Sequence, residues 1–135
     1  MANALYTKAK ENLLRGLIHW DADDIKAVLT DAGAYTLDIA THEFLSDVPA
    51  GARIATSGNL AGKSYTGGVA DATDVTITSV SGVSVEYVIL YQDTGVEGTS
   101  RLIACLDSYT SLPLNPNGGN VVIQWPSDAA KIFAL

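Results

Sequence analysis

Apolar and polar residues alternate along most of this chain, which is the pattern of β-strands that place one face against a core. Such stretches recur every ~8–12 residues, and turn-forming residues separate them, as is typical of a β-sandwich or small barrel. The predicted strands are 25–30, 53–56, 63–66, 75–78, 85–91, 101–107 and 121–125. No helical pattern separates the later strands, so a parallel α/β fold is not expected. The sequence predicts a mainly β, antiparallel protein.

One segment near the N-terminus has helical spacing instead. Apolar residues recur every four positions from Leu5 to Leu13, with Leu14 beside them, and predict a helix over 5–15 that Gly16 caps. A helix of about eleven residues is marginal alone, so something must cover its apolar stripe. We therefore predict an N-terminal helix and docking segment, residues 1–20, before a β-sandwich domain, residues 21–135. A further single helical turn is predicted over 41–45.

The strand predicted over 85–91 is apolar on both of its faces. A strand of this kind lies between two layers of one chain or in a subunit interface. The apolar end of the chain adds further side chains that need cover, so we expect an oligomer, and a homotrimer in particular. The candidate subunit-interface residues are Tyr87, Ile89, Tyr91, Ile132, Phe133 and Leu135.

Composition narrows the classes of function. The 135 residues are 47% apolar, enough for one domain with its own core, and fifteen acidic against eight basic residues give a net charge of −7. An acidic chain binds nucleic acid poorly, because Lys and Arg must displace the counterions of phosphates. No apolar stretch approaches the ~18–20 residues of a membrane span, and no secretory signal is present. We expect neither a nucleic-acid nor a membrane partner, and synthesis in a cytoplasm.

Two motifs resemble catalytic or nucleotide sites. The loop 58–64 has a Gly followed by Gly-Lys-Ser, but three residues separate them where a phosphate-binding loop has four, and an anti-helical run follows. We expect a plain loop. Cys105, the single cysteine, excludes an intramolecular disulfide and lies mid-strand, so we expect a buried structural thiol. The sequence leaves open a catalytic pair of Cys105 with His19 or His42.

Acidic and aromatic residues give the remaining candidates. Asp21–Asp24 begins like a calcium-binding loop but lacks its glycine and its final glutamate, and Asp71 and Asp74 form a second acidic pair. We expect solvated turns at both places. Trp20 and Trp125 could mark a sugar site, but each borders a predicted strand, where anchoring the core is commoner. Nothing here supports an enzyme, a metal or a cofactor.

The basic residues are unevenly placed. Lys8, Lys10 and Arg15 are three of only eight, and all three lie in the first fifteen positions. One interpretation is a solvated helix face. The other is a segment that docks on an acidic partner surface, and the two are left open here.

Several strings carry a resemblance to a known family. They are Thr41-His-Glu-Phe-Leu-Ser-Asp-Val-Pro-Ala-Gly-Ala-Arg53, Leu-Pro-Leu-Asn-Pro-Asn-Gly-Gly from Leu112 to Gly119, and the ending Lys-Ile-Phe-Ala-Leu after a strand with Trp125. With the opening Ala-Leu-Tyr…Lys-Ala-Lys-Glu and Ile-Lys-Ala-Val-Leu from Ile25, they resemble small proteins encoded among the head genes of tailed bacteriophages and prophages. The similarity spans nearly the whole chain.

The resemblance implies a structural virion protein for capsid decoration, also called a cement protein. Such a protein binds the outside of the assembled head and stabilises contacts between capsid subunits. The implied partners are the major capsid protein and further copies of the chain as a homotrimer, with no cofactor and no catalytic residues. The implied location is the capsid exterior of the virion, after synthesis in the host bacterial cytoplasm. The alternatives are a receptor- or glycan-binding tail or fibre module and a head–tail joining protein.

On this interpretation the N-terminal segment, Ala2 to Arg15, is the main contact with the capsid shell. The rival interpretation is that its leucines pack on the sandwich of their own chain. The capsid-contact candidates are Leu5, Tyr6, Lys8, Lys10, Leu13, Leu14 and Arg15.

Overall fold

The computed structural model describes residues 4–107, 112–125 and 131–135. These residues form nine strands, one α-helix and three short 3₁₀ turns, and all their strand pairs are antiparallel. The prediction of a mainly β, antiparallel fold with one short helix is confirmed. The elements are β1 (Ala4–Leu5), α1 (Thr7–Leu14), β2 (Ile25–Thr30), η1 (Leu45–Asp47), η2 (Ala50–Ala52), β3 (Arg53–Thr56), η3 (Thr66–Gly68), β4 (Val69–Ala70), β5 (Val75–Ile77), β6 (Tyr87–Gln92), β7 (Leu102–Leu106), β8 (Val121–Ile123) and β9 (Phe133–Ala134).

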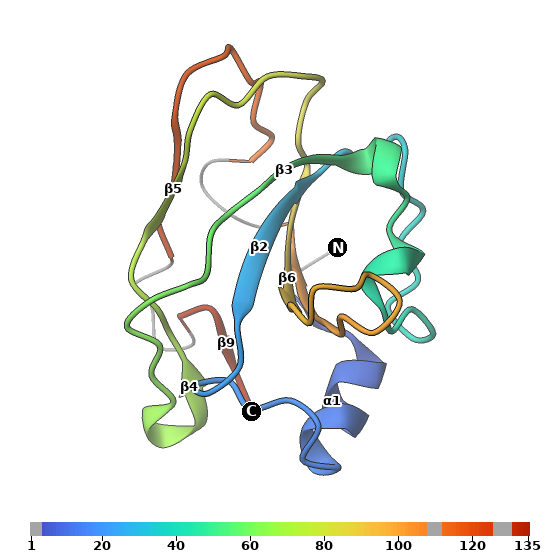
Figure 1. Cartoon of the computed structure of the whole chain (residues 1–135), viewed down its shortest axis with the longest axis vertical. Helices are drawn as coiled ribbons and strands as arrows, with labels where there is room; N and C mark the ends of the chain where they lie inside the picture. The colour runs from blue at the N-terminus through green and yellow to red at the C-terminus, as the bar shows by residue number, and fades with distance from the viewer. Residues whose placement is uncertain (1–3, 108–111, 126–130) are drawn as a thin grey trace.

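A five-stranded sheet in the order β1-β7-β6-β2-β3 crosses the middle of the molecule (Figure 1). Its longest pairing joins β2 to β6 over six residues, from Ile25 opposite Gln92 to Thr30 opposite Tyr87. Every residue of β7 and all but the first of β6 are buried. The apolar character of both faces of these strands therefore reflects a sheet that the chain itself covers on both sides.

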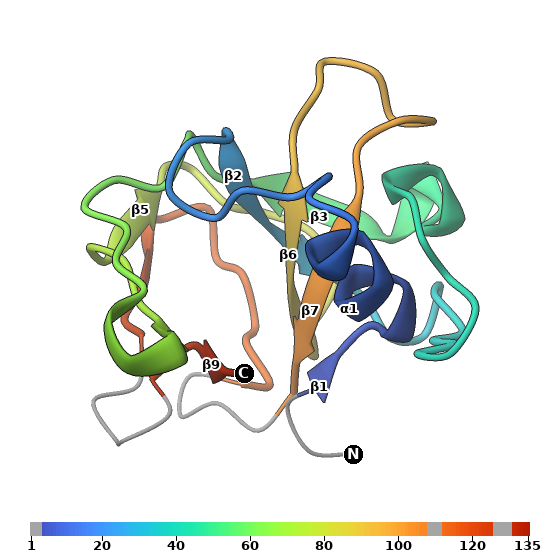
Figure 2. The ribbon, with the colours of Figure 1, turned by 90° about the horizontal axis from the view of Figure 1, so that it is seen from below.

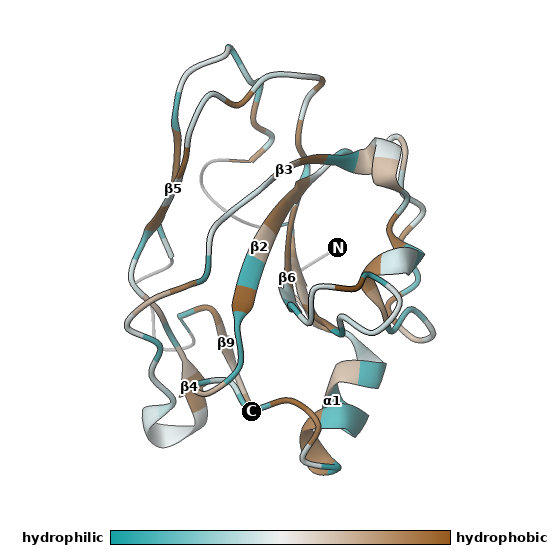
Figure 3. Ribbon diagram, viewed as in Figure 1, coloured by the Kyte–Doolittle hydropathy of each residue, from teal (hydrophilic) through white to brown (hydrophobic). Residues whose placement is uncertain are grey.

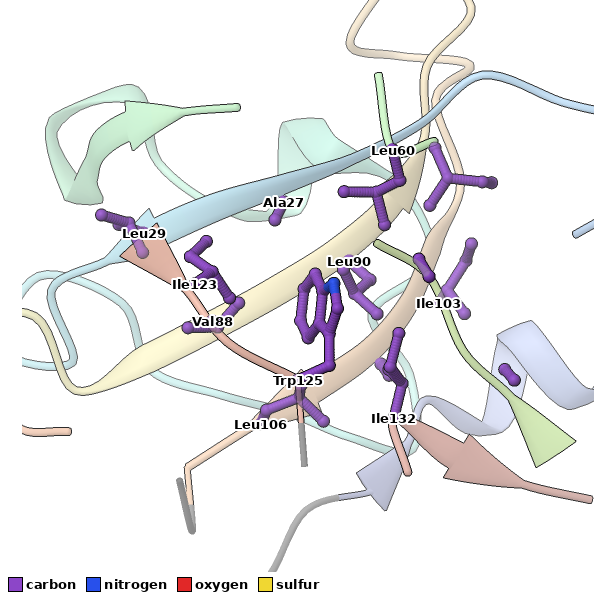
Figure 4. Packing of buried hydrophobic residues seen from close by; sticks show 14 of the residues in the cluster. Ala27, Leu29, Leu60, Val88, Leu90, Ile103, Leu106, Ile123, Trp125 and Ile132 are labelled. Carbon is purple, nitrogen blue, oxygen red and sulfur yellow. The ribbon is translucent and has the colours of Figure 1, made fainter. Parts of the chain in front are cut away.

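The first face of the sheet packs against a second layer of two small sheets, β4–β9 and β5–β8. In the close view, Val88, Leu90 and Leu106 of the large sheet lie beside Ile123 and Trp125 (Figure 4). Trp125 is buried and its indole N–H donates to the carbonyl oxygen of Thr73 at 3.1 Å. This tryptophan therefore anchors the core, as expected from its position beside a strand.

The second face of the sheet is covered by α1 and by the segment 31–52 with its 3₁₀ turns. α1 lies against β7, and Figure 2 shows the helix beside this strand. The buried side chains between these layers are Tyr6, Ala9, Val28, Tyr35, Leu45, Val48, Ala52, Ile89, Tyr91, Leu102 and Cys105. The apolar cover that the short helix needs is thus supplied largely by its own chain.

The helix begins two residues later than predicted. Leu5 lies opposite Ala104 in β1, and the main-chain N–H of Tyr6 still donates to Ile103 in β7 at 3.0 Å, so helical geometry starts only at Thr7. At the other end Gly16, at φ +71°, donates to Leu13, and the next N–H donates to the carbonyl of residue 12. This pair of bonds is a Schellman cap, so the predicted capping role of Gly16 is confirmed.

Two other local predictions need correction. The segment predicted as a strand over 63–66 makes only an isolated bridge, between Ser64 and Asp71, before the 3₁₀ turn η3. The helical turn predicted over 41–45 lies later, at Leu45–Asp47. Its position follows from Asp47, whose carboxylate accepts the N–H groups of Glu43 and Phe44 at 2.8 and 3.0 Å.

Cys105 lies in the second cluster with no exposed surface. Burial raises the pKa of its thiol to about 12, so the reactive thiolate is scarce at neutral pH. His42 uses its Nδ1 with the hydroxyl of Tyr35 at 2.7 Å, and no hydrogen bond joins either histidine to Cys105 within the described residues. The geometry favours the structural interpretation of this cysteine.

We expect the free energy of unfolding to fall as the pH rises from about 9 to about 12. Burial raises the pKa of Cys105 from 9.0 to about 12 and that of Tyr35 from 10.0 to about 12. Between those values the unfolded chain has lost these protons while the folded chain keeps them, so alkaline pH favours unfolding. Urea titrations at each pH, monitored by tryptophan fluorescence, measure the free energy of unfolding. Cys105→Ala is the control, because it removes the contribution of the thiol. An unchanged free energy across the range would contradict the burial of these groups.

Candidate functional site

Three adjoining surface hollows form one groove between α1 and β9. The first, about 440 Å³, lies between β1 and β9, and Lys10 joins it to a second of about 370 Å³ beside the end of α1. A third hollow of about 70 Å³ shares Leu13 and Leu135 with the second and is also lined by Trp20 and Tyr65. Figure 2 shows β1, α1 and β9 from the side on which they lie together. We call this the α1–β9 groove, and its residues are Leu5, Lys10, Leu13, Leu14, Tyr65, Phe133 and Leu135.

The groove gathers the most exposed large apolar side chains of the described residues. Leu14 is 89% exposed, Leu135 is 76% exposed and Tyr65 is 64% exposed. Figure 3 shows the apolar stretch at the end of α1. Scattered single exposed apolar residues are ordinary on protein surfaces, but their collection around one groove marks an interaction site.

Helix geometry explains why the leucines of α1 differ in exposure. Ala9 and Asn12 are three residues apart and buried on the face toward the sheet, and Leu13 is partly buried against the first core cluster. Leu14 lies about 100° further around the helix and points away from that cover. Asn12 is held by a hydrogen bond from its Nδ2 to the carboxylate of Glu43 at 3.1 Å, which fixes this rotation of the helix.

The opposite wall of the groove is held by aromatic and main-chain contacts. Phe133 lies opposite Ala70 in the β4–β9 pair, and its ring meets Trp20 edge-on at 5.4 Å between centroids. The indole N–H of Trp20 donates to the carbonyl oxygen of Ser64 at 3.0 Å. These contacts place β9 across from α1 and leave Leu135 at the rim.

Two basic residues lie in or beside the groove. Lys10 and Arg15 are exposed, and neither makes an ion pair within the described part of the chain. Lys8, by contrast, pairs with Glu11 one helical turn on at 3.4 Å. Lys10 lines the first two hollows and Arg15 follows Leu14 at the end of α1, so two of the eight basic residues of this acidic chain lie in or beside the groove.

The predicted contact residues of the N-terminal segment divide into two groups. Leu5, Lys10, Leu13 and Leu14 line the groove, and Arg15 follows them on the surface. The structure corrects Tyr6, because its side chain is completely buried and its hydroxyl makes a hydrogen bond of 3.1 Å to that of Tyr35 in the core. Lys8 is partly buried beside Glu11. Residues 2 and 3 of the predicted segment lie outside the described residues.

The predicted subunit-interface residues also divide. Phe133 and Leu135 lie in the groove, but Ile89, Tyr91 and Ile132 are at most 4% exposed within one chain. The structure corrects the assignment of Ile89 and Tyr91, because the segment 31–52 covers them, whereas Ile132 packs in the first core cluster and lines the first hollow of the groove. Tyr87 is partly buried, with its ring edge-on to Tyr35 at 6.4 Å.

The other candidates have structural explanations. The carboxylate of Asp23 accepts the main-chain N–H of His19 at 2.7 Å and the amide of Gln92 at 2.6 Å, so it organises a turn. Lys63, the lysine of the loop that resembles a phosphate site, donates to the main-chain carbonyl of Asp23. Among the described residues no group of three His, Cys, Asp or Glu side chains is placed to hold a metal ion. Nor does the described part contain a helix that is sufficiently long and apolar to cross a bilayer.

Neither a scan against protein-family models nor a search of curated proteins found a match to this chain.

Proposed function

We propose that this protein is a capsid decoration protein of a tailed bacteriophage, which binds the outside of the assembled head and stabilises contacts between capsid subunits. The observation that supports this most is the α1–β9 groove, where Leu14 and Leu135 are exposed beside Lys10, which has no ion-pair partner among the described residues. The rest of the chain is a sheet covered on both faces by its own residues. This combination suits a rigid structural module with one docking surface.

The apolar residues of the groove supply most of the proposed affinity. Burial of apolar surface is worth about 25 cal/mol per Å², from which the cost of ordering the partners is subtracted. Exposed ion pairs add only about 0–1 kcal/mol each. Lys10 and Arg15 therefore act mainly on the rate and orientation of docking to an acidic shell surface.

The proposal includes a homotrimer on the capsid exterior, with the major capsid protein as the other partner and synthesis in the host cytoplasm. Of the predicted interface residues, Ile132, Phe133 and Leu135 line the groove, which α1 shares. The groove of each copy can bind one partner at a time. We assign the groove to contact with the capsid shell, not to contact with a second copy of the chain. Sedimentation of the free and particle-bound chain tests the trimer, which a monomer in both states would contradict.

We expect Lys10→Glu to slow binding to phage heads and to reduce its dependence on salt. The change replaces attraction to an acidic shell by repulsion at an exposed position that makes no ion pair with the residues that the structure describes. Association kinetics with purified heads at low and high salt measure the effect. Val83→Glu combined with Val96→Glu, at exposed positions outside the groove, is the matched control, because it also changes the net charge by two units. Equal slowing by both variants would contradict a role for Lys10 in docking.

A further inference from the structure

The turn that precedes β8 carries a reactive pair of residues far from the groove. Asn117 is followed directly by Gly118, and both are exposed. Asparagine is among the residues that age chemically in proteins. An Asn-Gly pair is the most susceptible arrangement, because glycine has no side chain to obstruct attack by its main-chain nitrogen on the asparagine amide. The pair is therefore a site of spontaneous deamidation wherever the chain is free to adopt the reactive geometry.

The reaction needs only water and involves no oxidation or reduction. The main-chain nitrogen of Gly118 gives up its proton and forms a bond to Cγ of Asn117, and the side-chain nitrogen leaves as ammonia. Water then opens the cyclic imide at one of its two carbonyls. The product is an aspartate, or an isoaspartate whose main chain runs through the former side chain, and each carries one new negative charge.

The attacking nitrogen is engaged in the folded chain. The N–H of Gly118 donates to the main-chain carbonyl of Val80 at 2.7 Å, and the N–H of Val80 donates to the carbonyl of Gly119 at 2.9 Å. The side chain of Val80 is buried in the first core cluster, which fixes the position of its carbonyl. The proton that the reaction must remove is therefore held in a hydrogen bond to an anchored acceptor.

The side chain under attack is held as well. Oδ1 of Asn117 accepts the main-chain N–H of Gly119 at 2.9 Å, which fixes the orientation of the amide. Oδ1 of Asn120 accepts the N–H of Ser79 at 3.2 Å and joins the two segments once more. These contacts continue the β5–β8 pair at the end away from β4 and β9 (Figure 1).

We propose that Asn117 is a deamidation site that the contacts between residues 79–80 and 118–120 hold in check. We call these contacts the 80–118 clip. Asn117 keeps its amide while the clip is formed, and it reacts when this end of the β5–β8 pair opens. An isoaspartate lengthens the main chain before Gly118, so the clip cannot form again in the same register. This inference is independent of the proposed function.

Peptide mapping by mass spectrometry, after incubation of the full chain at mildly alkaline pH, measures deamidation at Asn117. The rate in the folded chain should be about tenfold or more below that of the same chain unfolded in urea, since local opening must precede the reaction. Asn115 is the internal control, because Pro116 has no N–H and cannot attack by this route. Equal rates in the folded and unfolded chain would overturn the protection, and an unreactive Asn117 in urea would overturn the site.

Hydrogen exchange at the amide of Gly118 gives a second measurement, because exchange and cyclisation remove the same proton. Folding should slow the two processes by the same factor, within about threefold. An amide that exchanges freely in the folded chain would overturn the clip as the cause of any protection.

A matched pair of variants at residue 120 tests the clip without changing the reactive pair. Asn120→Ala removes the side-chain bond to Ser79, so deamidation at Asn117 should be about threefold faster or more, as expected for loss of one hydrogen bond. Asn120→Asp keeps an acceptor at this exposed position and should leave the rate close to that of the original chain. Equal acceleration by both variants would overturn the part that this bond has in the clip.

Discussion

Replacement of Tyr6 with alanine is expected to lower the free energy of unfolding by about 3–5 kcal/mol, the usual cost of deleting a buried aromatic side chain. Tyr6 has no exposed surface and packs between the sheet and the segment 31–52. Its hydroxyl also pairs with that of Tyr35, which the substitution leaves without this partner. The large effect follows because a residue beside the N-terminus is part of the central core.

Urea denaturation of Tyr6→Ala and Tyr6→Phe measures this expectation. The phenylalanine variant keeps the ring and loses only the hydroxyl contact, so its loss should be about 1 kcal/mol. A chain that begins at Trp20 should fail to fold, because it lacks β1 and α1 as well as Tyr6. Full stability of Tyr6→Ala would show that the N-terminal segment is separate from the core.

Leu14→Asp combined with Leu135→Asp is expected to weaken binding to phage heads by about a hundredfold or more, equivalent to about 2.7 kcal/mol. Both leucines are highly exposed at the groove, and a carboxylate in place of each puts charge where apolar surface should be buried. Because neither side chain packs in the core, the free energy of unfolding should change by less than about 0.5 kcal/mol.

Co-sedimentation with heads and urea denaturation together measure this separation of binding from stability. Val83→Asp combined with Val96→Asp is the matched control, since these two valines are 56% and 60% exposed outside the groove. Undiminished binding of the double variant would show that the groove is not the shell contact. A large loss of stability instead would show that these leucines belong to the core.

The elements with strong periodicity were predictable from the sequence, and the shortest ones were not. The alternation in Ile25–Thr30 and the four-residue spacing before Gly16 produced a correct strand and a correct helix cap. The two-residue strands β1 and β4 carry no period that could reveal them. Their formation depends on partners far along the chain, such as Cys105 opposite Ala4.

The cover of the sheet shows a second limit of sequence patterns. Ile89 and Tyr91 form an apolar strand face, and the sequence could not distinguish a subunit interface from an internal layer. The segment that covers them supplies Tyr35, Leu45 and Val48 at irregular spacing, so it has no helical or strand pattern. Its packing is a long-range result that only the fold reveals.

The sequence patterns assign the residues of the groove to two separate interfaces. The residues of α1 are assigned to the shell and those of the C-terminal end to a second copy. Pairing of β1 with β7 and of β9 with β4 brings Leu14 and Leu135 to one surface, although they are far apart in sequence. Since both pairings are long-range, no local pattern could show that the two predicted interfaces coincide.

Electron cryo-microscopy of purified heads bearing the chain is the measurement that tests the central claim most directly. The account predicts many copies on the outside of the shell, each with α1 and β9 toward the capsid. A few copies at a single vertex or on a fibre, or copies whose α1–β9 groove faces solvent, would contradict it.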